Sequence, residues 1–149
     1  MIKALARRTA MGAVSLHLLL QAPPAIASSV EIEANDQGHY MTTADIDHSA
    51  VKVLIDTGAS FVALSYEDAE SAGLRPRGLS YDVPIGTANG VVQGARVTLS
   101  RVEIGNVVVR DVEGIVLPRG AYNGTLLGMS FLSKLDSFKF EDGRLYLRQ

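Results

Sequence analysis

The sequence predicts a mainly β fold, a small barrel or sandwich with two short helices. From residue 30 onward, short runs rich in Val, Ile and Leu alternate with Gly, Asn and Asp, which is typical of strands joined by turns. Only two stretches carry helix-capping signals, and both are short. With 149 residues, of which 47% are hydrophobic and 20% charged, the composition indicates one ordinary globular domain.

The first 27 residues are predicted to be a signal peptide. Lys3, Arg7 and Arg8 precede an apolar run over 11–20, and Ala25-Ile26-Ala27 has the small residues of a cleavage site. The run is shorter than the roughly 20 residues that span a bilayer as a helix. We therefore expect export, in a bacterium to the periplasm. The alternative is an uncleaved leader that anchors the chain in the inner membrane, facing the periplasm, and only then would the protein contact a membrane.

The remaining domain, residues 28–149, is acidic. Loss of Lys3, Arg7 and Arg8 leaves 11 basic against 16 acidic residues, a net charge of −5. This charge argues against nucleic acid as a partner. The sequence has no Cys, so disulfides cannot stabilise the domain even in an oxidising compartment. Stability must come from packing, including any subunit interface.

The strands are expected in seven segments along this domain. They cover 51–55, 61–64, 81–87, 91–104, 107–112, 137–140 and 144–147. The last two flank Glu141-Asp142-Gly143, and Asp-Gly is a strong hairpin signal.

Two short helices are expected between these strands. Ser65, with Asp68 three residues later, predicts the cap of a helix over 67–72 that ends at Gly73. The second follows Ser130 and covers 131–135. Neither is long enough to organise the fold.

The chemistry concentrates at Val53-Leu54-Ile55-Asp56-Thr57-Gly58-Ala59-Ser60. Here an apolar strand delivers the carboxylate of Asp56 into a turn at the edge of the core, where desolvation disfavours the charged form of an unpaired acid. Gly58 permits a close backbone approach, and the hydroxyl of Thr57 can tie this turn to a neighbouring one.

This segment resembles the active-site loop of clan AA aspartic proteases, in the retropepsin-like branch. About 70 residues later, Thr125-Leu126-Leu127-Gly128 resembles the segment through which that loop passes. The residues from Leu127 to Leu132 look like those of bacterial exported members. Between them, the hairpin tip Ala88-Asn89-Gly90 is placed like the protease flap. The resemblance covers most of residues 38–149.

The resemblance implies an aspartic endopeptidase with a single-lobe, retropepsin-like barrel. Its chemistry needs two carboxylates that share a proton, whereas this chain has one such motif. The implied solution is a homodimer in which Asp56 meets its symmetry mate. Thr57 would hydrogen-bond across the dimer, and Gly58 would meet the substrate backbone. The flap would close over an extended peptide bound by strand addition. Neither a cofactor nor a metal is implied.

The residue after the Asp-Thr-Gly triplet bears on the pH optimum. Ala59 stands where pepsin-like relatives place a Ser or Thr that hydrogen-bonds the catalytic carboxylate. A carboxylate without that donor holds its proton to higher pH, which predicts a mildly acidic optimum. The neighbouring Ser60 is an alternative source of the donor.

Other interpretations of the sequence are less consistent with it. A non-catalytic peptide-binding module on the same fold has no use for an intact Asp-Thr-Gly. If the protein were a purely structural β-sandwich, the joint spacing of the loop, the flap and the Leu-Leu-Gly segment would be a coincidence. His39 and His48 lie nine residues apart with no Cys and no evident third ligand, so no metal site is predicted. We expect solvated turns or strand edges, not a second catalytic acid, at Asp45, Asp47, Asp82, Asp111 and Asp136.

Overall fold

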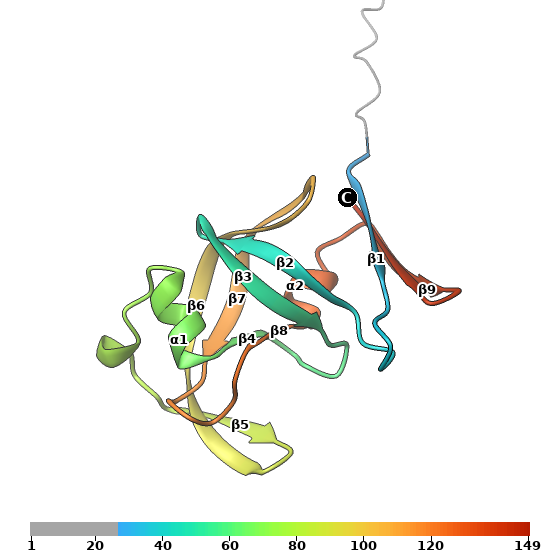
Figure 1. Ribbon diagram of the computed structural model, residues 1–149. Helices are drawn as coiled ribbons and strands as arrows, with labels where there is room; N and C mark the ends of the chain where they lie inside the picture. The colour runs from blue at the N-terminus through green and yellow to red at the C-terminus, as the bar shows by residue number, and fades with distance from the viewer. Residues whose placement is uncertain (1–26) are drawn as a thin grey trace, which may run out of the picture.

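The computed structural model describes residues 27–149, which form a β-barrel with a smaller sheet at its side (Figure 1). The predicted signal peptide lies outside the described residues except for Ala27, and so stays a prediction. Across residues 27–149, every helix is too short or too polar to cross a membrane.

The prediction of a mainly β fold with two short α-helices is confirmed. Within the described residues the elements are β1 (Ser29–Glu33), β2 (Met41–Ile46), β3 (Ser49–Ile55), β4 (Val62–Leu64), α1 (Tyr66–Ser71), the 3₁₀ turn η1 (Pro76–Gly78), β5 (Val83–Thr87), β6 (Gly90–Ile104), β7 (Val107–Val116), β8 (Thr125–Leu127), α2 (Met129–Leu132), β9 (Ser137–Glu141) and β10 (Arg144–Arg148).

Seven strands form the barrel sheet in the order β2-β3-β8-β4-β7-β6-β5, and a further pairing of β2 with β6 closes it. At this closure Asp45 pairs with Glu103 and Ile46 with Val102. Ile46 and Val102 are fully buried, so apolar packing supports the closing pair. Closure leaves β5 as the edge of the sheet, where it forms a hairpin with the outer part of β6.

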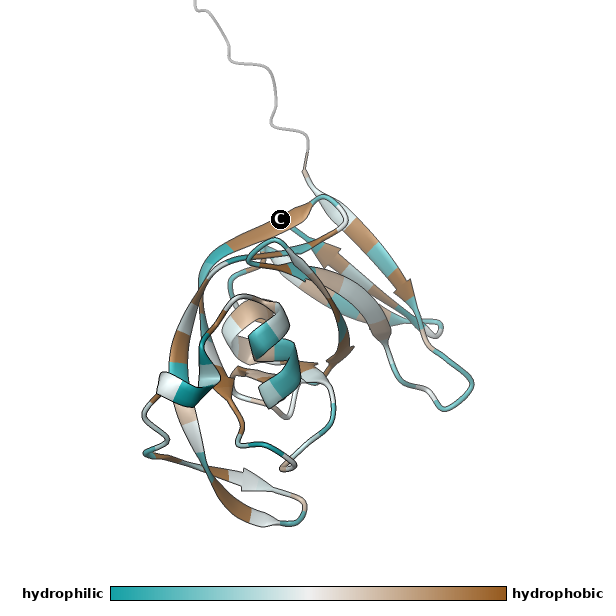
Figure 2. Cartoon of the chain, turned by 60° about the vertical axis from the view of Figure 1, so that its left-hand side comes forward, coloured by the Kyte–Doolittle hydropathy of each residue, from teal (hydrophilic) through white to brown (hydrophobic). Residues whose placement is uncertain are grey.

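The core fills the barrel and continues under α2, which contacts β4 and β7. Phe131 and Leu132 of α2 are fully buried in it. The β5–β6 hairpin projects from the barrel at the bottom of Figure 2, away from this core.

The smaller sheet has the order β1-β10-β9, with β10 in the middle. Its inner face buries Ile32, Leu145 and Leu147 against the barrel core. A bridge between Ala34 and Tyr40 connects β1 to the start of β2 and so joins the two sheets. Because β9 and β10 form the expected hairpin, the prediction for the Asp-Gly turn is confirmed.

Several element boundaries differ from the sequence prediction. Strands β1, β2 and β8 were not among the predicted segments, and β7 continues to Val116. The prediction of a helix over 131–135 is wrong in its bounds, because α2 covers 129–132 with Gly128 at its N-cap. Ser130 does not cap this helix, since its hydroxyl bonds to β4 and β7 instead. The predicted cap of α1 is confirmed, since Ser65 Oγ accepts from Asp68 N at 3.1 Å.

The burial of Phe131 gives a first stability prediction. Phe131→Ala removes a fully buried ring and is expected to lower the free energy of unfolding by about 3–5 kcal/mol. Val91, which is 70% exposed, is the control position. Val91→Ala should change the free energy of unfolding by less than about 0.5 kcal/mol. Urea unfolding followed by circular dichroism measures both values. Equal losses in the two variants would contradict the assigned core.

Candidate active site

Asp56 follows the last residue of β3, and neighbouring strands hold its backbone on both sides. The Asp56 N–H donates to Leu127 O at 3.1 Å, and the Ile55 N–H donates to Tyr40 O at 2.9 Å. Strand β8 runs parallel to β3 and antiparallel to β4. Strand β8 therefore lies between β3 and β4, the two arms that the loop over 56–61 connects. This pairing fixes the position of the Asp56 carboxylate.

The loop crosses directly over Gly128, the residue after β8. A Cβ at this position would collide with the carbonyl oxygen of Phe61 and would lie 2.5 Å from that of Ala59. The Met129 N–H donates to Ala59 O at 2.8 Å, and the Ser130 N–H donates to Ser60 O at 2.9 Å. These bonds hold the loop against the start of α2. The sequence-predicted supporting segment, Leu126-Leu127-Gly128, thus lies directly beneath the active-site loop.

Within the single chain, Asp56 is half-buried, while Thr57, Gly58 and Ser60 are exposed. The Gly58 N–H donates to Asp56 Oδ1 at 2.8 Å, which turns the carboxylate toward its own loop. No hydroxyl of residues 27–149 donates to this carboxylate. Within the single chain, Ser60 therefore does not supply the donor that Ala59 lacks. The exposed residues Thr57 and Gly58 leave room for another surface to approach the carboxylate.

A cleft of about 660 Å³ opens over this loop. It brings together the predicted loop and flap, because both contribute to its wall. Apart from Asp56 its lining is uncharged and mainly apolar. The lining residues are Leu54, Asp56, Gly58, Ala59, Ser60, Phe61, Ala63, Pro84, Ile85, Gly86, Thr87, Ala88, Asn89, Ile115, Leu117, Ala121, Tyr122 and Leu126.

The predicted flap is the hairpin of β5 and β6. Thr87 pairs with Gly90, so its turn residues are Ala88 and Asn89, and Gly90 begins β6. Thr87 Oγ1 donates to Gly90 O at 2.7 Å and closes the turn. Ala88 and Asn89 line the cleft, whereas Gly90 does not. The turn is therefore shifted by one residue from an Asn-Gly tip.

Ser130 supports the site, a role that the sequence analysis did not assign. Its Oγ donates to Glu113 O at 2.6 Å and accepts from the Val62 N–H at 2.9 Å. One hydroxyl thereby joins α2, β4 and β7 behind the loop. In the sequence, the signal for this role is a Ser two residues after Leu-Leu-Gly, a position that also favours a helix start.

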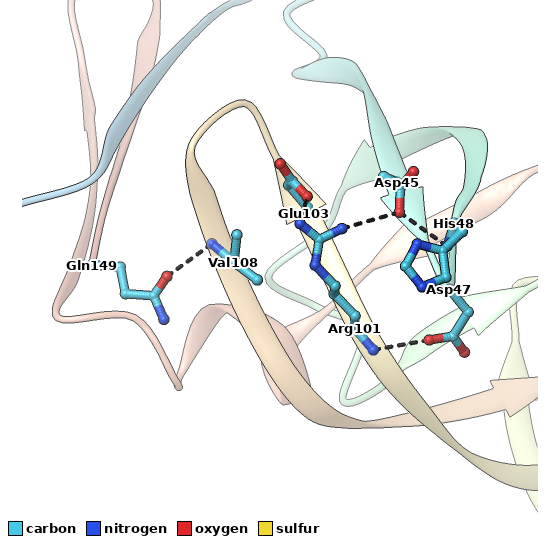
Figure 3. Close-up of polar contacts among 7 residues, drawn as sticks. All are labelled: Asp45, Asp47, His48, Arg101, Glu103, Val108 and Gln149. Atoms are coloured by element: carbon cyan, nitrogen blue, oxygen red, sulfur yellow. Dashed lines mark hydrogen bonds and ion pairs between the residues drawn. The ribbon is translucent and has the colours of Figure 1, made fainter.

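Other acidic residues predicted to lie outside the site do so. Figure 3 shows Arg101 of β6 beside the β2–β3 turn, with its guanidinium directed at Asp45 and its backbone N–H at Asp47. Asp47 Oδ1 accepts from the Arg101 N–H at 2.9 Å, and Asp45 Oδ1 accepts from the His48 N–H at 3.0 Å. These carboxylates do not line the cleft, and neither do Asp82, Asp111 and Asp136.

Over residues 27–149, no three His, Cys, Asp or Glu side chains are grouped to hold a metal ion.

The arrangement therefore supplies one positioned carboxylate, an apolar cleft and a hairpin over it. Two carboxylates that share a proton can activate a water molecule for attack on an amide carbonyl. This chain contributes one of the two to the cleft.

The model of a protein family matches the chain over residues 42–134, and its description is "gag-polyprotein putative aspartyl protease". The matched region begins in β2 and ends just after α2. It contains the active-site loop, the flap and the supporting segment.

Two curated bacterial proteins, both described as uncharacterized, are similar in sequence. One, from the cobV 5′ region of a Sinorhizobium species, is 44% identical over 74% of this chain and 48% of its own length. The other, from Rickettsia prowazekii, is 34% identical over 78% of this chain and 49% of its own length. The chain thus spans about half the length of each.

Two solved structures share the fold. The retropepsin-like aspartic protease from Rickettsia conorii superposes with a TM-score of 0.75 and 32% identity, covering 83% of this chain and 92% of that protein. The EIAV protease, solved with the inhibitor HBY-793, superposes with a TM-score of 0.58 and 21% identity, covering 72% and 96%. The second likeness concerns the fold alone.

The crossing at Gly128 predicts a large effect of one methyl group. Gly128→Ala should lower the free energy of unfolding by at least about 2 kcal/mol, because the colliding atoms are backbone oxygens that cannot rotate away. Gly78 has no atom within 4 Å of its Cβ position, so Gly78→Ala serves as the control. Chemical unfolding of both variants tests this. A Gly128→Ala protein as stable as the control would show that the loop does not cross here.

Ser130→Ala is expected to lower the free energy of unfolding by about 1–2 kcal/mol, because it leaves the part-buried Val62 N–H without its acceptor and removes the bond to the Glu113 carbonyl. The Val62 amide should also exchange its hydrogen faster, which amide exchange measured by NMR would detect. Ser80→Ala, at an exposed position, is the matched control. Unchanged exchange at Val62 would argue against the proposed link.

Proposed function

Because the chain belongs to the retropepsin-like family of aspartic proteases, we propose that it is an endopeptidase built from two copies of itself. In this proposal the Asp56 carboxylates of a homodimer together activate the water that hydrolyses a peptide bond. The observation that carries it is the position of Asp56. It is the one charged residue lining an otherwise uncharged cleft, on a loop that β8 and Gly128 hold in place.

The proposed reaction divides acid and base roles between the two carboxylates. Like charges so close together cannot both ionise, so one carboxyl keeps its proton. The ionised carboxylate takes a proton from a water molecule while the oxygen of that water attacks the peptide carbonyl carbon. The protonated carboxyl donates its proton to the carbonyl oxygen. Return of a proton to the amide nitrogen then allows the C–N bond to break. No cofactor takes part in this sequence.

The edge strand and the apolar lining of the cleft support an extended peptide as the substrate. The β5 strand is the edge of the barrel sheet, and an edge can pair with an added strand. Apolar side chains on the cleft wall, among them Leu54, Ile85 and Leu126, favour apolar substrate side chains. In this proposal Gly58 meets the peptide backbone and Thr57 hydrogen-bonds across the dimer. The turn of Ala88 and Asn89 covers the bound peptide.

We further propose that the protein works in the periplasm, either released by signal cleavage or held at the inner membrane by its leader. The basic residues and apolar run of the first 27 residues support export. Cell fractionation with antibody detection tests this. Recovery of the protein from the cytoplasm alone would refute it.

The central prediction concerns Asp56→Asn. This change keeps the shape of the side chain but removes its acid–base chemistry, and it should reduce cleavage of denatured casein by about 10²–10⁴-fold or more. Asp111→Asn is the control, since Asp111 is exposed and away from the cleft. Rates are measured across pH, with the maximum expected in the mildly acidic range. Full activity of Asp56→Asn would refute the proposal.

A mixing experiment tests whether the two carboxylates come from different copies. When equal amounts of wild-type and Asp56→Asn chains are refolded together, only dimers of two wild-type chains should be active. About a quarter of the activity of an all-wild-type sample of the same total concentration should then remain. A single-chain site would retain about half, because each wild-type chain would work alone. A dimeric protein that cleaves nothing would favour a peptide-binding module.

A further inference from the structure

We infer that Arg119 is a positioning residue for substrate binding, because it ties one wall of the cleft to helix α1. This inference rests on the proposed function, since the wall matters only if a peptide binds in the cleft. The wall is the loop over 117–124, which connects β7 to β8 and contains no helix or strand. We call this segment the wall loop.

The wall loop supplies apolar surface to the cleft. Leu117, Ala121 and Tyr122 line the cleft, whereas Arg119, which stands between them in the sequence, does not. Leu117 is buried, and Ala121 packs against the same small apolar cluster. A peptide in the cleft would contact this loop directly, so a shift of the loop would change the shape of the binding surface.

Backbone hydrogen bonds hold the two ends of the wall loop but not its middle. The Leu117 N–H donates to Leu64 O at 2.9 Å, and the Ser65 N–H donates to Gly124 O at 3.0 Å. Among the described residues, the backbone of 118–123 makes one hydrogen bond, and both of its partners lie within the loop. The position of the middle of the loop therefore depends on side chains.

Arg119 connects the middle of the wall loop to three residues of α1. Its Nη1 lies 2.7 Å from Glu67 Oε1, and its Nη2 lies 3.8 Å from Glu70 Oε2. The guanidinium also lies over the ring of Tyr66, with Cζ 4.1 Å from the ring centroid. Glu70 is four residues after Tyr66 and three after Glu67, so it lies on the same side of the helix as both. We call these contacts the Arg119 clamp.

The helix that holds Arg119 is itself fixed to the barrel. Ala69 of α1 is fully buried in the core. Asp68 Oδ2 accepts from the buried hydroxyl of Thr125 at 2.8 Å, which ties α1 to the start of β8. The clamp therefore joins a loop that is held only at its ends to a firm support.

The clamp is exposed, so it contributes little to the stability of the fold. The side chains of Arg119, Glu67 and Glu70 are 61%, 52% and 54% exposed. Ion pairs at such positions are weak, and salt screens them. A weak tie can still affect binding, because a wall loop that is not held must be ordered when a peptide binds. Loss of the clamp should thus raise KM and leave kcat unchanged.

Neutralisation of Arg119 tests the clamp. Arg119→Gln should raise KM for denatured casein about three- to ten-fold at low salt, with kcat changed less than about two-fold. Arg119→Lys keeps the charge but loses the planar fork, so its KM should lie between those of wild type and Arg119→Gln. Arg144→Gln is the matched control, because exposed Arg144 also contacts two carboxylates, those of Glu31 and Glu33. Arg144 does not line the cleft, so this control should keep the wild-type KM.

Salt and a second substitution separate the clamp from a general effect of charge. Raising NaCl from about 0.05 M to about 1 M should bring the wild-type KM toward that of Arg119→Gln. Glu67→Gln alone should also raise KM. Combined with Arg119→Gln, it should add less than its effect alone, because both changes remove the same contact.

Amide hydrogen exchange tests the clamp without cleavage. The Ala121 N–H donates to Pro118 O at 3.1 Å within the wall loop, so its exchange rate reports the shape of the loop. In Asp56→Asn chains, Arg119→Gln should speed exchange at Ala121 by about three-fold or more. The Ile55 amide, which donates to Tyr40 O beside the active-site loop, should exchange at an unchanged rate. NMR measures both rates.

The outcomes distinguish this inference from the proposed function. Wild-type KM and wild-type Ala121 exchange in Arg119→Gln would overturn the clamp, while cleavage that depends on Asp56 would leave the proposed function standing. A lower kcat with faster exchange at both amides would overturn it too, because Arg119 would then support the whole fold. Faster exchange at Ala121 alone, in a protein that cleaves nothing, would refute both the proposed function and the role of the clamp in substrate binding.

Discussion

The site depends on one steric constraint: the backbone oxygens of Ala59 and Phe61 lie where a Cβ of Gly128 would stand. This close crossing lets β8 enter between the two arms of the active-site loop and pair with both. The hydrogen bonds from residues 129 and 130 to the loop follow from the same approach. A loop with its backbone groups paired in this way can hold a partly exposed carboxylate in one position without a disulfide.

Rigidity is distributed unevenly around the cleft. Behind the loop, Ser130 joins α2 to β4 and β7, and Phe131 fixes that helix in the core. Over the loop, the flap is a two-stranded ribbon at the edge of the sheet. Two-stranded ribbons are only marginally stable by themselves. A fixed loop beneath a weakly supported hairpin would suit the proposed function, in which a long peptide enters the cleft and is then covered.

The sequence predicted the parts that local chemistry specifies. Asp56-Thr57-Gly58, the Leu-Leu-Gly segment and the β9–β10 hairpin carry signals in adjacent residues, and the structure has the loop, its support and the hairpin where they were expected. What it missed depends on tertiary contacts. Strand β8 has three residues, too few for a periodic pattern, and exists because β3 and β4 pair with it. The role of Ser130 depends on the carbonyl of Glu113, 17 residues away.

The site is incomplete in one chain, because the cleft contains a single carboxylate and the two residues after it, Thr57 and Gly58, are exposed. In the proposed homodimer, apolar contacts between the copies would offset part of the cost of bringing two carboxylates together, since burying an apolar side chain contributes roughly 1.5–3 kcal/mol. Association and catalysis would then use adjacent surfaces. Enzyme activity would depend on protein concentration, and a chain alone would be unable to cleave its neighbours.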